Sequence, residues 1–366
     1  MNHINEIKIT AFRGICDLEL SDLSQINIIA GDNNCGKTSI LEAIDCFEQP
    51  ENMGKWSSLT RRINTPARYN DMTLYEGISD LFNINSENKS VQCMLKTEKE
   101  AYTLVAKASE SIEEMTEKTY AKKIGLKYLN ESSEELEQET REVAKMKFEV
   151  SLNGEIILNE DIYEGQRNAL NSRVTISDDS GKIVYISPFR HVTGSVFLND
   201  ILNSPELYEE MLSVLKEYDN DIISINYDNE SGYIRGTYKI LSKAHKKALP
   251  LNVYGDGMKK AILLMSAVVK AKNGILLLDE FETAIHTSAM ENTFKWILKT
   301  CKKLNVQVFM TSHSIEAISK VLKCCPDMEK DIRMITLADT KNGIKARNVN
   351  GSKAIKLMDV YGLELR

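Results

Sequence analysis

The chain has 366 residues, a net charge of −7, 42% hydrophobic residues and 27% charged residues. These values are typical of a globular protein with one large core or two lobes. The longest apolar run, residues 261–269, is far shorter than the roughly 20 residues of a transmembrane helix. The first residues show no basic start followed by an apolar block, so we expect no secretion signal, and the seven scattered cysteines form no CxxC pair. We therefore expect a cytoplasmic protein without a membrane span, whose acidity does not favour coating nucleic acid.

The first part of the chain predicts strands, a glycine-rich loop and a helix. Residues 4–12 and 17–20 alternate as short strands, and residues 26–30 form a compact apolar run of strand length. Residues 38–47 carry apolar side chains at helical spacing. The glycine-rich loop therefore lies where a buried strand ends and a helix begins.

The middle of the chain, about residues 91–188, is patterned mostly as strands and turns, with Asn153 and Gly154 forming a hairpin turn. Residues 109–147 are rich in charge, and Ser132 with Glu135 has the spacing of a helix capping box. We expect a helical insert there. Because a helix rises only about 1.5 Å per residue, this insert is too short to be a long projecting arm.

The second half alternates helices with apolar strands, which indicates a parallel sheet. We expect helices at residues 204–217, 256–272, 288–303, 314–323 and 352–361, a hairpin at 222–240, and strands at 274–279, 306–311, 332–339 and 344–349. The expected fold is α/β, with a mixed-sheet lobe, a parallel core sheet and the helical insert. It forms a single domain over residues 1–366, divided into a first lobe (1–190), a helical and hairpin insert (191–250) and a second lobe (251–366).

Gly31, Gly36, Lys37 and Thr38 fit the pattern G-x-x-x-x-G-K-[ST] of a phosphate-binding loop. The glycines let backbone N–H groups point at phosphate oxygens, Lys37 offers a cation, and Thr38 offers a hydroxyl to Mg²⁺. The alternative is a glycine-rich turn that binds nothing, but the strand before and the helix after favour nucleotide binding. The expected binding residues are Gly31, Asn33, Asn34, Cys35, Gly36, Lys37, Thr38 and Ser39.

Two further polar groups follow apolar strands. Asp279 and Glu280 end one strand, where ligands of open α/β sheets bind. Asp279 would hold the metal, and Glu280 would orient or deprotonate the attacking water, unless both only cap the next helix. His313 follows the next strand and could hydrogen-bond the γ-phosphate, although a lone histidine is more often structural.

A second glycine turn opens the long helix at residue 256. Its residues Gly255, Asp256 and Gly257 form another helix N-terminus suited to an anion. The residues alone leave open whether this turn meets the same nucleotide or another one.

In chain order these motifs resemble those of ABC-type ATPase heads: a Walker A loop, a glycine signature, a Walker B strand and a switch histidine. The resemblance is closest to the branch of structural-maintenance-of-chromosomes (SMC), RecF and OLD (overcoming lysogenization defect) ATPases, and within it to stand-alone OLD-like prokaryotic ATP-binding proteins of the AAA type. It implies a P-loop NTPase fold in which Arg13, after the opening strand, reaches the nucleotide. Gly255 replaces the usual signature serine, and no Q-loop glutamine is identified.

The same resemblance implies a homodimer that sandwiches two ATP molecules, with Gly255, Asp256 and Gly257 acting on the partner's nucleotide. The chain would be a Mg²⁺-dependent ATPase with Lys37, Glu280 and His313 as catalytic residues, and Thr38 and Asp279 as metal ligands. We expect no Toprim nuclease domain of the kind found in full OLD proteins. The ATP-driven switch would instead control a partner effector, such as a nuclease or toxin encoded nearby, in an anti-phage or abortive-infection system.

Two alternatives remain at this point. The chain could be a RecF-like DNA-binding ATPase of DNA repair, which the acidic total disfavours. It could also be a nucleotide-binding scaffold with little turnover, which the altered signature at Gly255 makes reasonable. These motifs do not distinguish ATP from GTP.

Overall fold

The strand that ends at the phosphate-binding loop lies inside a six-stranded sheet of order β15–β14–β3–β13–β12–β8. In the computed structural model these strands run parallel, except for the antiparallel edge strand β15. Their bounds are β3 (Ile26–Gly31), β8 (Ile183–Ile186), β12 (Ile275–Leu278), β13 (Gln307–Ser312), β14 (Ile332–Thr340) and β15 (Gly343–Asn350). The predicted parallel core sheet is confirmed.

The structure describes most of the chain. The described residues are 3–60, 72–83, 89–126, 139–167, 183–188, 196, 198–228, 237–283, 285, 287–341 and 343–361. The capping box predicted at Ser132 and Glu135 and the tip of the 222–240 hairpin lie outside these residues.

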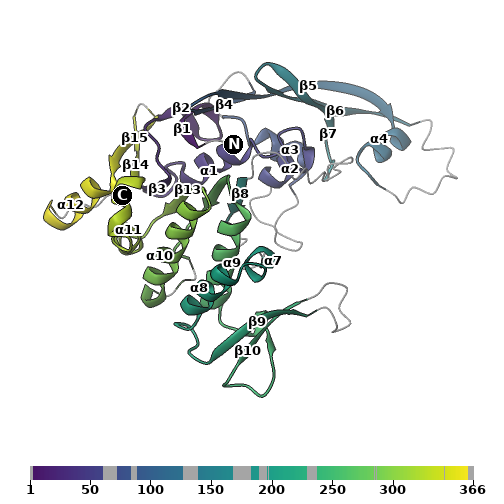
Figure 1. Ribbon diagram of the computed structural model, residues 1–366. Coiled ribbons are helices and arrows are strands. Elements are labelled where there is room, and N and C mark those ends of the chain that lie inside the picture. Colours follow the sequence, from purple (N-terminus) through teal and green to yellow (C-terminus); the bar gives the residue numbers. More distant parts are fainter. Residues whose placement is uncertain are drawn as a thin grey trace.

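Both faces of the parallel sheet are buried, as continuous apolar strands require. One face packs on four helices, seen below the sheet in Figure 1: α8 (Pro205–Leu215), α9 (Asp256–Lys270), α10 (Thr287–Lys303) and α11 (Ile315–Lys323). The other face packs on α1 (Lys37–Asp45) and on a second sheet. Neighbouring strand residues alternate between the two cores, since Leu276 and Leu278 face the helices while Leu277 faces α1.

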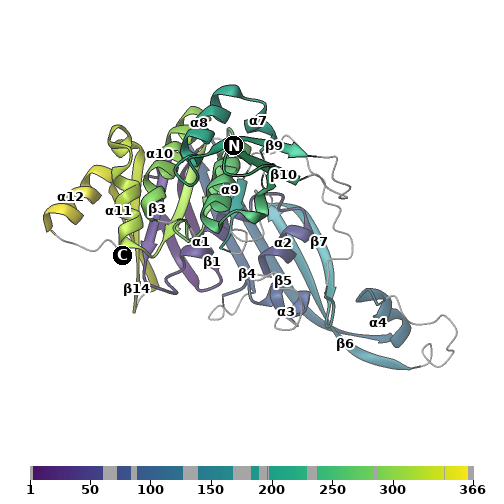
Figure 2. The same ribbon diagram turned by 90° about the horizontal axis from the view of Figure 1, so that it is seen from below.

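The second sheet is antiparallel, with the order β2–β1–β4–β5–β6–β7. It extends from the core toward α4 in both views (Figures 1 and 2). Its strands are β1 (Ile4–Phe12), β2 (Ile15–Leu20), β4 (Ser90–Thr97), β5 (Ala101–Thr116), β6 (Thr140–Leu152) and β7 (Glu155–Tyr163). Asn153 and Gly154 both have positive φ angles in the turn between β6 and β7, which confirms the predicted hairpin.

The prediction of a helical insert over residues 109–147 is wrong for most of its described residues. Only α4 (Glu117–Lys123) is helical, while residues 109–116 and 140–147 pair as antiparallel strands. Some of the many charged residues in this segment form ion pairs between strands. The Nζ of Lys145 lies 3.4 Å from Oε2 of Glu113 and 2.9 Å from Oδ2 of Asp161. A strand rises about 3.3 Å per residue, so this segment does form a projecting arm. We call described residues 109–126 and 139–147 the β5–β6 arm.

The remaining elements are short. A three-stranded sheet contains β9 (Ile222–Asp228), β10 (Thr237–Ser242) and β11 (Leu249–Pro250). The other helices are α2 (Met53–Thr60), α3 (Leu74–Ser79), α7 (Asn199–Leu202) and α12 (Gly351–Tyr361), with 3₁₀ turns η1 (Leu251–Val253) and η2 (Pro326–Asp331). Across the described part of the chain, no helix has the length and apolar composition needed to cross a membrane.

Candidate active site

The glycine-rich loop bends sharply between β3 and α1. Gly36 has φ 87°, a left-handed conformation that side chains disfavour. A Cβ on Gly31 would lie 2.6 Å from the Leu337 carbonyl oxygen and 2.7 Å from Cys35 Sγ. Backbone conformation at Gly36 and close approach at Gly31 therefore require glycine at these two positions.

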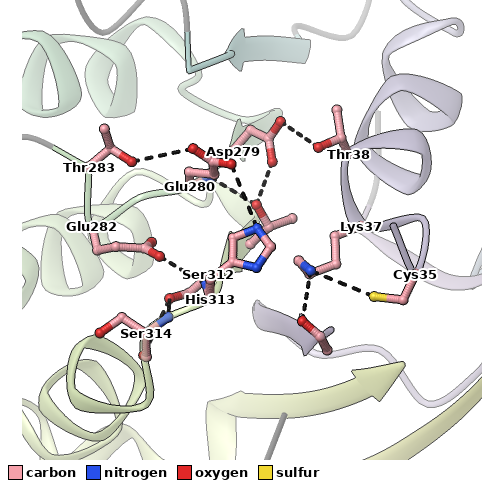
Figure 3. A network of polar contacts seen from close by, with 12 residues as sticks. Cys35, Lys37, Thr38, Asp279, Glu280, Glu282, Thr283, Ser312, His313 and Ser314 are labelled. Atoms are coloured by element: carbon pink, nitrogen blue, oxygen red, sulfur yellow. Dashed lines mark hydrogen bonds and ion pairs between the residues drawn. The ribbon is translucent and has the colours of Figure 1, made fainter. Parts of the chain in front are cut away.

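The side chain of Lys37 is held inside this loop. Its Nζ donates to the carbonyl oxygens of Gly31 at 2.8 Å and Asp32 at 2.7 Å, and lies 3.6 Å from Cys35 Sγ (Figure 3). The residue is only 5% exposed. The loop thus keeps a cation against its own backbone, where an anion could compete with the two carbonyl groups.

Asp279 is the buried acceptor at the centre of the site. Its Oδ2 accepts the hydroxyl of Thr38 at 2.9 Å and that of Tyr185 at 3.3 Å, and its Oδ1 accepts the hydroxyl of Thr311 at 2.5 Å. Burial, followed by the charge of Asp279, raises the pKa of Tyr185 well above its usual value, so the phenol stays protonated as a donor. The carboxylate is therefore fixed in orientation by three hydroxyl groups.

The residues around Asp279 fit a magnesium ion. Thr38 and Asp279 offer only oxygen atoms, which Mg²⁺ prefers, and both lie beside the phosphate-binding loop. Within the described ranges, no group of three or more His, Cys, Asp or Glu side chains could hold a metal alone. This matches Mg²⁺ bound by few protein groups together with substrate phosphates.

Glu280 adopts an unusual backbone conformation next to Asp279. Its φ is 50°, and its N–H donates to Thr311 Oγ1 at 2.9 Å. Non-glycine residues in this left-handed region cluster at functional sites. The side chain is 39% exposed, and its Oε1 lies 3.7 Å from His313 Nε2. Glu280 is thus accessible to a water molecule, unlike its buried neighbour.

The turn that carries His313 is fixed to the turn after β12. The His313 N–H donates to Oε1 of Glu282 at 2.9 Å, and Ser314 caps α11 by accepting the N–H of Ala317. Figure 3 shows Glu280, Glu282 and His313 gathered opposite Lys37. The predicted neighbourhood of His313 and the Asp279-Glu280 pair is confirmed as geometry.

Arg13 is engaged by the protein itself. Its Nε lies 2.9 Å from Glu42 Oε2, and its NH2 group donates to the carbonyl oxygen of Leu59 at 2.8 Å. Asn83 holds the Arg13 carbonyl at 2.5 Å. Arg13 is therefore anchored to α1 and α2 at the edge of the site, and its predicted contact with a nucleotide stays a prediction.

A cleft of about 1080 Å³ opens over these groups. Its lining includes Arg13, Gly14, Asn33, Asn34, Gly36, Lys37, Thr38, Ser39, Ser79, Asp80, Phe82, Asn83, Lys89, Glu280, His313 and Ile344. Most of the predicted nucleotide-binding residues thus meet at one cleft, with Asp279 buried and bonded to Thr38.

The glycine turn Gly255–Gly257 is not part of this lining. Gly255 precedes α9 with no side-chain cap, and a Cβ there would meet nothing within 4 Å. Asp256 is 82% exposed and pairs with Lys259 at 2.7 Å. In the single chain this turn is therefore exposed to solvent.

Sequence reasoning missed several groups at the site. Thr311 and Tyr185 hold Asp279, and Glu42 pairs with Arg13. Thr311 lies two positions before His313 in the same strand-to-turn segment, so its location was the available signal. Tyr185 and Glu42 come from separate elements, and nothing in the local sequence marked them.

Comparisons with known proteins agree with this geometry. The profile of a family described as AAA ATPase domain matches residues 3–318. An "ATP/GTP phosphatase" of Helicobacter pylori is 24% identical over 355 residues, covering 87% of this chain and 88% of that protein. An uncharacterized protein of Methanocaldococcus jannaschii is 30% identical over 112 residues, covering 31% of this chain and 98% of its own length.

Two solved structures share the fold. One is an SMC head bound to the C-winged helix domain of ScpA, with TM-score 0.50 and 15% identity, covering 97% of this chain and 99% of that chain. The other is an SMC head with an extended coiled coil, bound to the C-terminal domain of ScpA and derived from Pyrococcus furiosus, with TM-score 0.50 and 11% identity, covering 99% and 100%. The predicted ABC-type head of the SMC-like branch is thereby confirmed as a fold.

Proposed function

Because the chain belongs to the AAA ATPase domain family and is an ATP hydrolase, we propose that it acts as an ATP-driven dimerisation switch. Each of two copies would place its Gly255–Gly257 turn against the nucleotide held by the other. The observation that carries this proposal is spatial. The cleft gathers Lys37, Glu280 and His313, whereas the glycine turn is not part of its lining and has open space around Gly255.

In the proposed reaction the loop binds the triphosphate first. Lys37 would exchange its bonds to the carbonyls of Gly31 and Asp32 for the terminal phosphates, while backbone N–H groups of the loop contact phosphate oxygens. Thr38 and Asp279 would hold Mg²⁺, which neutralises charge on the phosphates when bound.

Glu280 is the proposed base. It would accept a proton from the water that attacks the γ-phosphorus, as the bond to the β-phosphate oxygen breaks and leaves ADP and phosphate. His313, which lies 3.7 Å from Glu280, would donate a hydrogen bond to the γ-phosphate and lose this contact once phosphate leaves. Dimer closure and hydrolysis would thus depend on the same phosphate.

The output of the switch is proposed to be a partner effector, in an anti-phage or abortive-infection system. The β5–β6 arm supports this proposal, because it carries Ile112 at 72% exposure and Leu126 at 59% exposure. The two related SMC heads were solved with ScpA domains bound, so heads of this fold do accept protein partners.

A direct DNA-binding role receives less support. A hollow on the antiparallel sheet is lined by Lys89, Lys107 and Lys147. However, Lys89 pairs with Glu110 at 2.6 Å, and Glu149 lies 3.9 Å from Lys147. A surface with such mixed charge offers little of the uncompensated positive field that binds phosphate backbones.

Size-exclusion chromatography with light scattering tests the switch. Glu280→Gln with ATP and Mg²⁺ is expected to accumulate as a dimer, because binding is retained while hydrolysis is blocked. The matched control is the double variant Lys37→Ala/Glu280→Gln, which should remain a monomer under the same conditions. A Glu280→Gln protein that stays monomeric at saturating ATP would refute the proposal.

A further inference from the structure

A lysine that takes no part in the proposed reaction is buried near the turn after β12, which carries Glu280 and Glu282. Lys260 lies on α9, shortly after the glycine turn, and is 0% exposed. Lysine is almost never fully buried unless a counter-charge compensates its ammonium group. Nothing in the described part of the chain accepts a direct hydrogen bond from its Nζ.

The counter-charges of Lys260 come from the turn after β12. Glu282 contributes the larger electrostatic attraction and Glu280 the smaller one. Burial lowers the pKa of Lys260 to about 7, and these two carboxylates act against that decrease. The Oε2 atom of Glu282 is also buried, and it too has no direct hydrogen-bond donor among described residues. Glu282 is therefore the main electrostatic partner of Lys260.

The other carboxylate oxygen of Glu282 reaches the histidine turn. Oε1 accepts the His313 N–H at 2.9 Å, and the His313 ring lies 3.7 Å from Glu280 (Figure 3). One carboxylate thus connects a buried lysine on α9 with the segment that carries His313.

We propose that Lys260 is a positioning residue for ATP hydrolysis. Its buried amine attracts the carboxylate of Glu282 electrostatically without a direct hydrogen bond, and Glu282 fixes the His313 turn relative to Glu280. This inference rests on the proposed function, since it assumes that Glu280 and His313 act at the γ-phosphate. Small displacements of reacting groups are costly, so removing this electrostatic attraction lowers the catalytic rate more than nucleotide binding.

Steady-state ATPase kinetics of four variants test this role. Lys260→Met removes the amine at similar length, and Glu282→Gln removes the charge but keeps an oxygen for the His313 N–H. We expect Lys260→Met to lower kcat about 10-fold to 100-fold with KM changed less than about twofold. The double variant Lys260→Met/Glu282→Gln should lose no more than Lys260→Met, because groups that act as a unit are not additive. Lys270→Met, at the exposed far end of α9, is the control and should match the wild type.

Folding and binding are measured alongside. Thermal melting and titration with a fluorescent ATP analogue identify variants that are folded and loaded. If Lys260→Met does not fold, the double variant decides, since removing both buried charges leaves neither unpaired. A wild-type kcat in Lys260→Met or in the double variant would overturn the inference. So would a loss of kcat in the double variant equal to the combined losses of the two single variants. If the Glu280→Gln variant instead hydrolysed ATP at the wild-type rate, the proposed function itself would have failed.

Discussion

Thr38 donates its hydroxyl to Oδ2 of Asp279 at 2.9 Å, although 241 positions separate the two residues. The sheet brings them together, because β3 and β12 both flank β13 and all three end at the same edge. Ligands of open α/β sheets bind at this edge. The relationship joins the phosphate-binding loop to the acidic strand and predicts where the metal lies.

Asp279→Asn should weaken the response to magnesium. Asparagine has the same shape but no negative charge, and only one of its two terminal atoms can accept a hydroxyl group. It is therefore a poorer ligand for Mg²⁺ and cannot keep all of the hydroxyl contacts that orient Asp279. The Mg²⁺ concentration for half-maximal ATPase activity should rise at least about tenfold. Tyr185→Phe, which removes only the longest of the three hydroxyl contacts, should give a smaller increase. Identical magnesium curves for Asp279→Asn and the wild type would exclude Asp279 as a ligand.

Gly36→Ala should damage both stability and nucleotide binding. Alanine at φ 87° costs about 1–2 kcal/mol, and its Cβ would press on Ile15 and Ile344 at 3.1 Å. Gly154 has the same φ of 87° but open space around it, so Gly154→Ala isolates the backbone cost. Chemical denaturation should rank Gly36→Ala as the less stable, and calorimetry should find impaired ATP binding in that variant alone. Equal affinities would show that the loop conformation does not matter.

Gly255→Trp should separate binding from dimerisation. A side chain at Gly255 meets nothing within 4 Å in the single chain, and its φ of −61° is ordinary. The variant should therefore melt like the wild type and bind ATP, but fail to form the ATP-dependent dimer in the Glu280→Gln background. Ile156→Trp, at a position 55% exposed on β7, supplies equal bulk elsewhere and should still dimerise. Dimerisation of Gly255→Trp would place the interface on another face.

The buried Lys260 predicts a pH dependence of stability. Its pKa is lowered to about 7 in the folded chain, so between this pH and its ordinary value near 10.4 the unfolded chain binds more protons. The free energy of unfolding therefore rises with pH through this window, and the burial penalty is complete below it. Between pH 7 and pH 9 the wild type should gain up to about 2 kcal/mol relative to Lys260→Met. Denaturant titrations of both proteins measure this difference, and parallel pH profiles would contradict it.

The chemistry-bearing turns were predictable because each motif is local. The loop around Lys37, the strand ending at Asp279 and the turn at His313 need only short-range patterns, and their meeting follows from parallel strands sharing an edge. The tertiary contacts of single side chains were harder to predict. Lys260 precedes the inward residues Leu263 and Leu264 by three and four positions, and this helical spacing indicates that it is buried but does not identify its partners.

The β5–β6 arm was mispredicted because its composition favours a helix. Residues 140–147 contain glutamate, lysine, alanine and methionine, which are good helix formers, yet they pair as a strand with residues 109–116. Cross-strand ion pairs at Lys145 and burial of Val143 and Met146 outweigh that propensity. Helix propensity depends only on the local sequence, so it carries no information about partners on a neighbouring strand.

The most direct test of the central claim is complementation in a mixed dimer. Lys37→Ala and Gly255→Trp should each lack ATPase activity, one through its own cleft and the other through its outward turn. Neither variant should dimerise with itself, so the dimers that form in a mixture are mixed dimers, each with one intact cleft facing one intact turn. ATPase activity should therefore reappear, up to about half of the wild-type level. A mixture no more active than its separate components would contradict an active site shared between two copies.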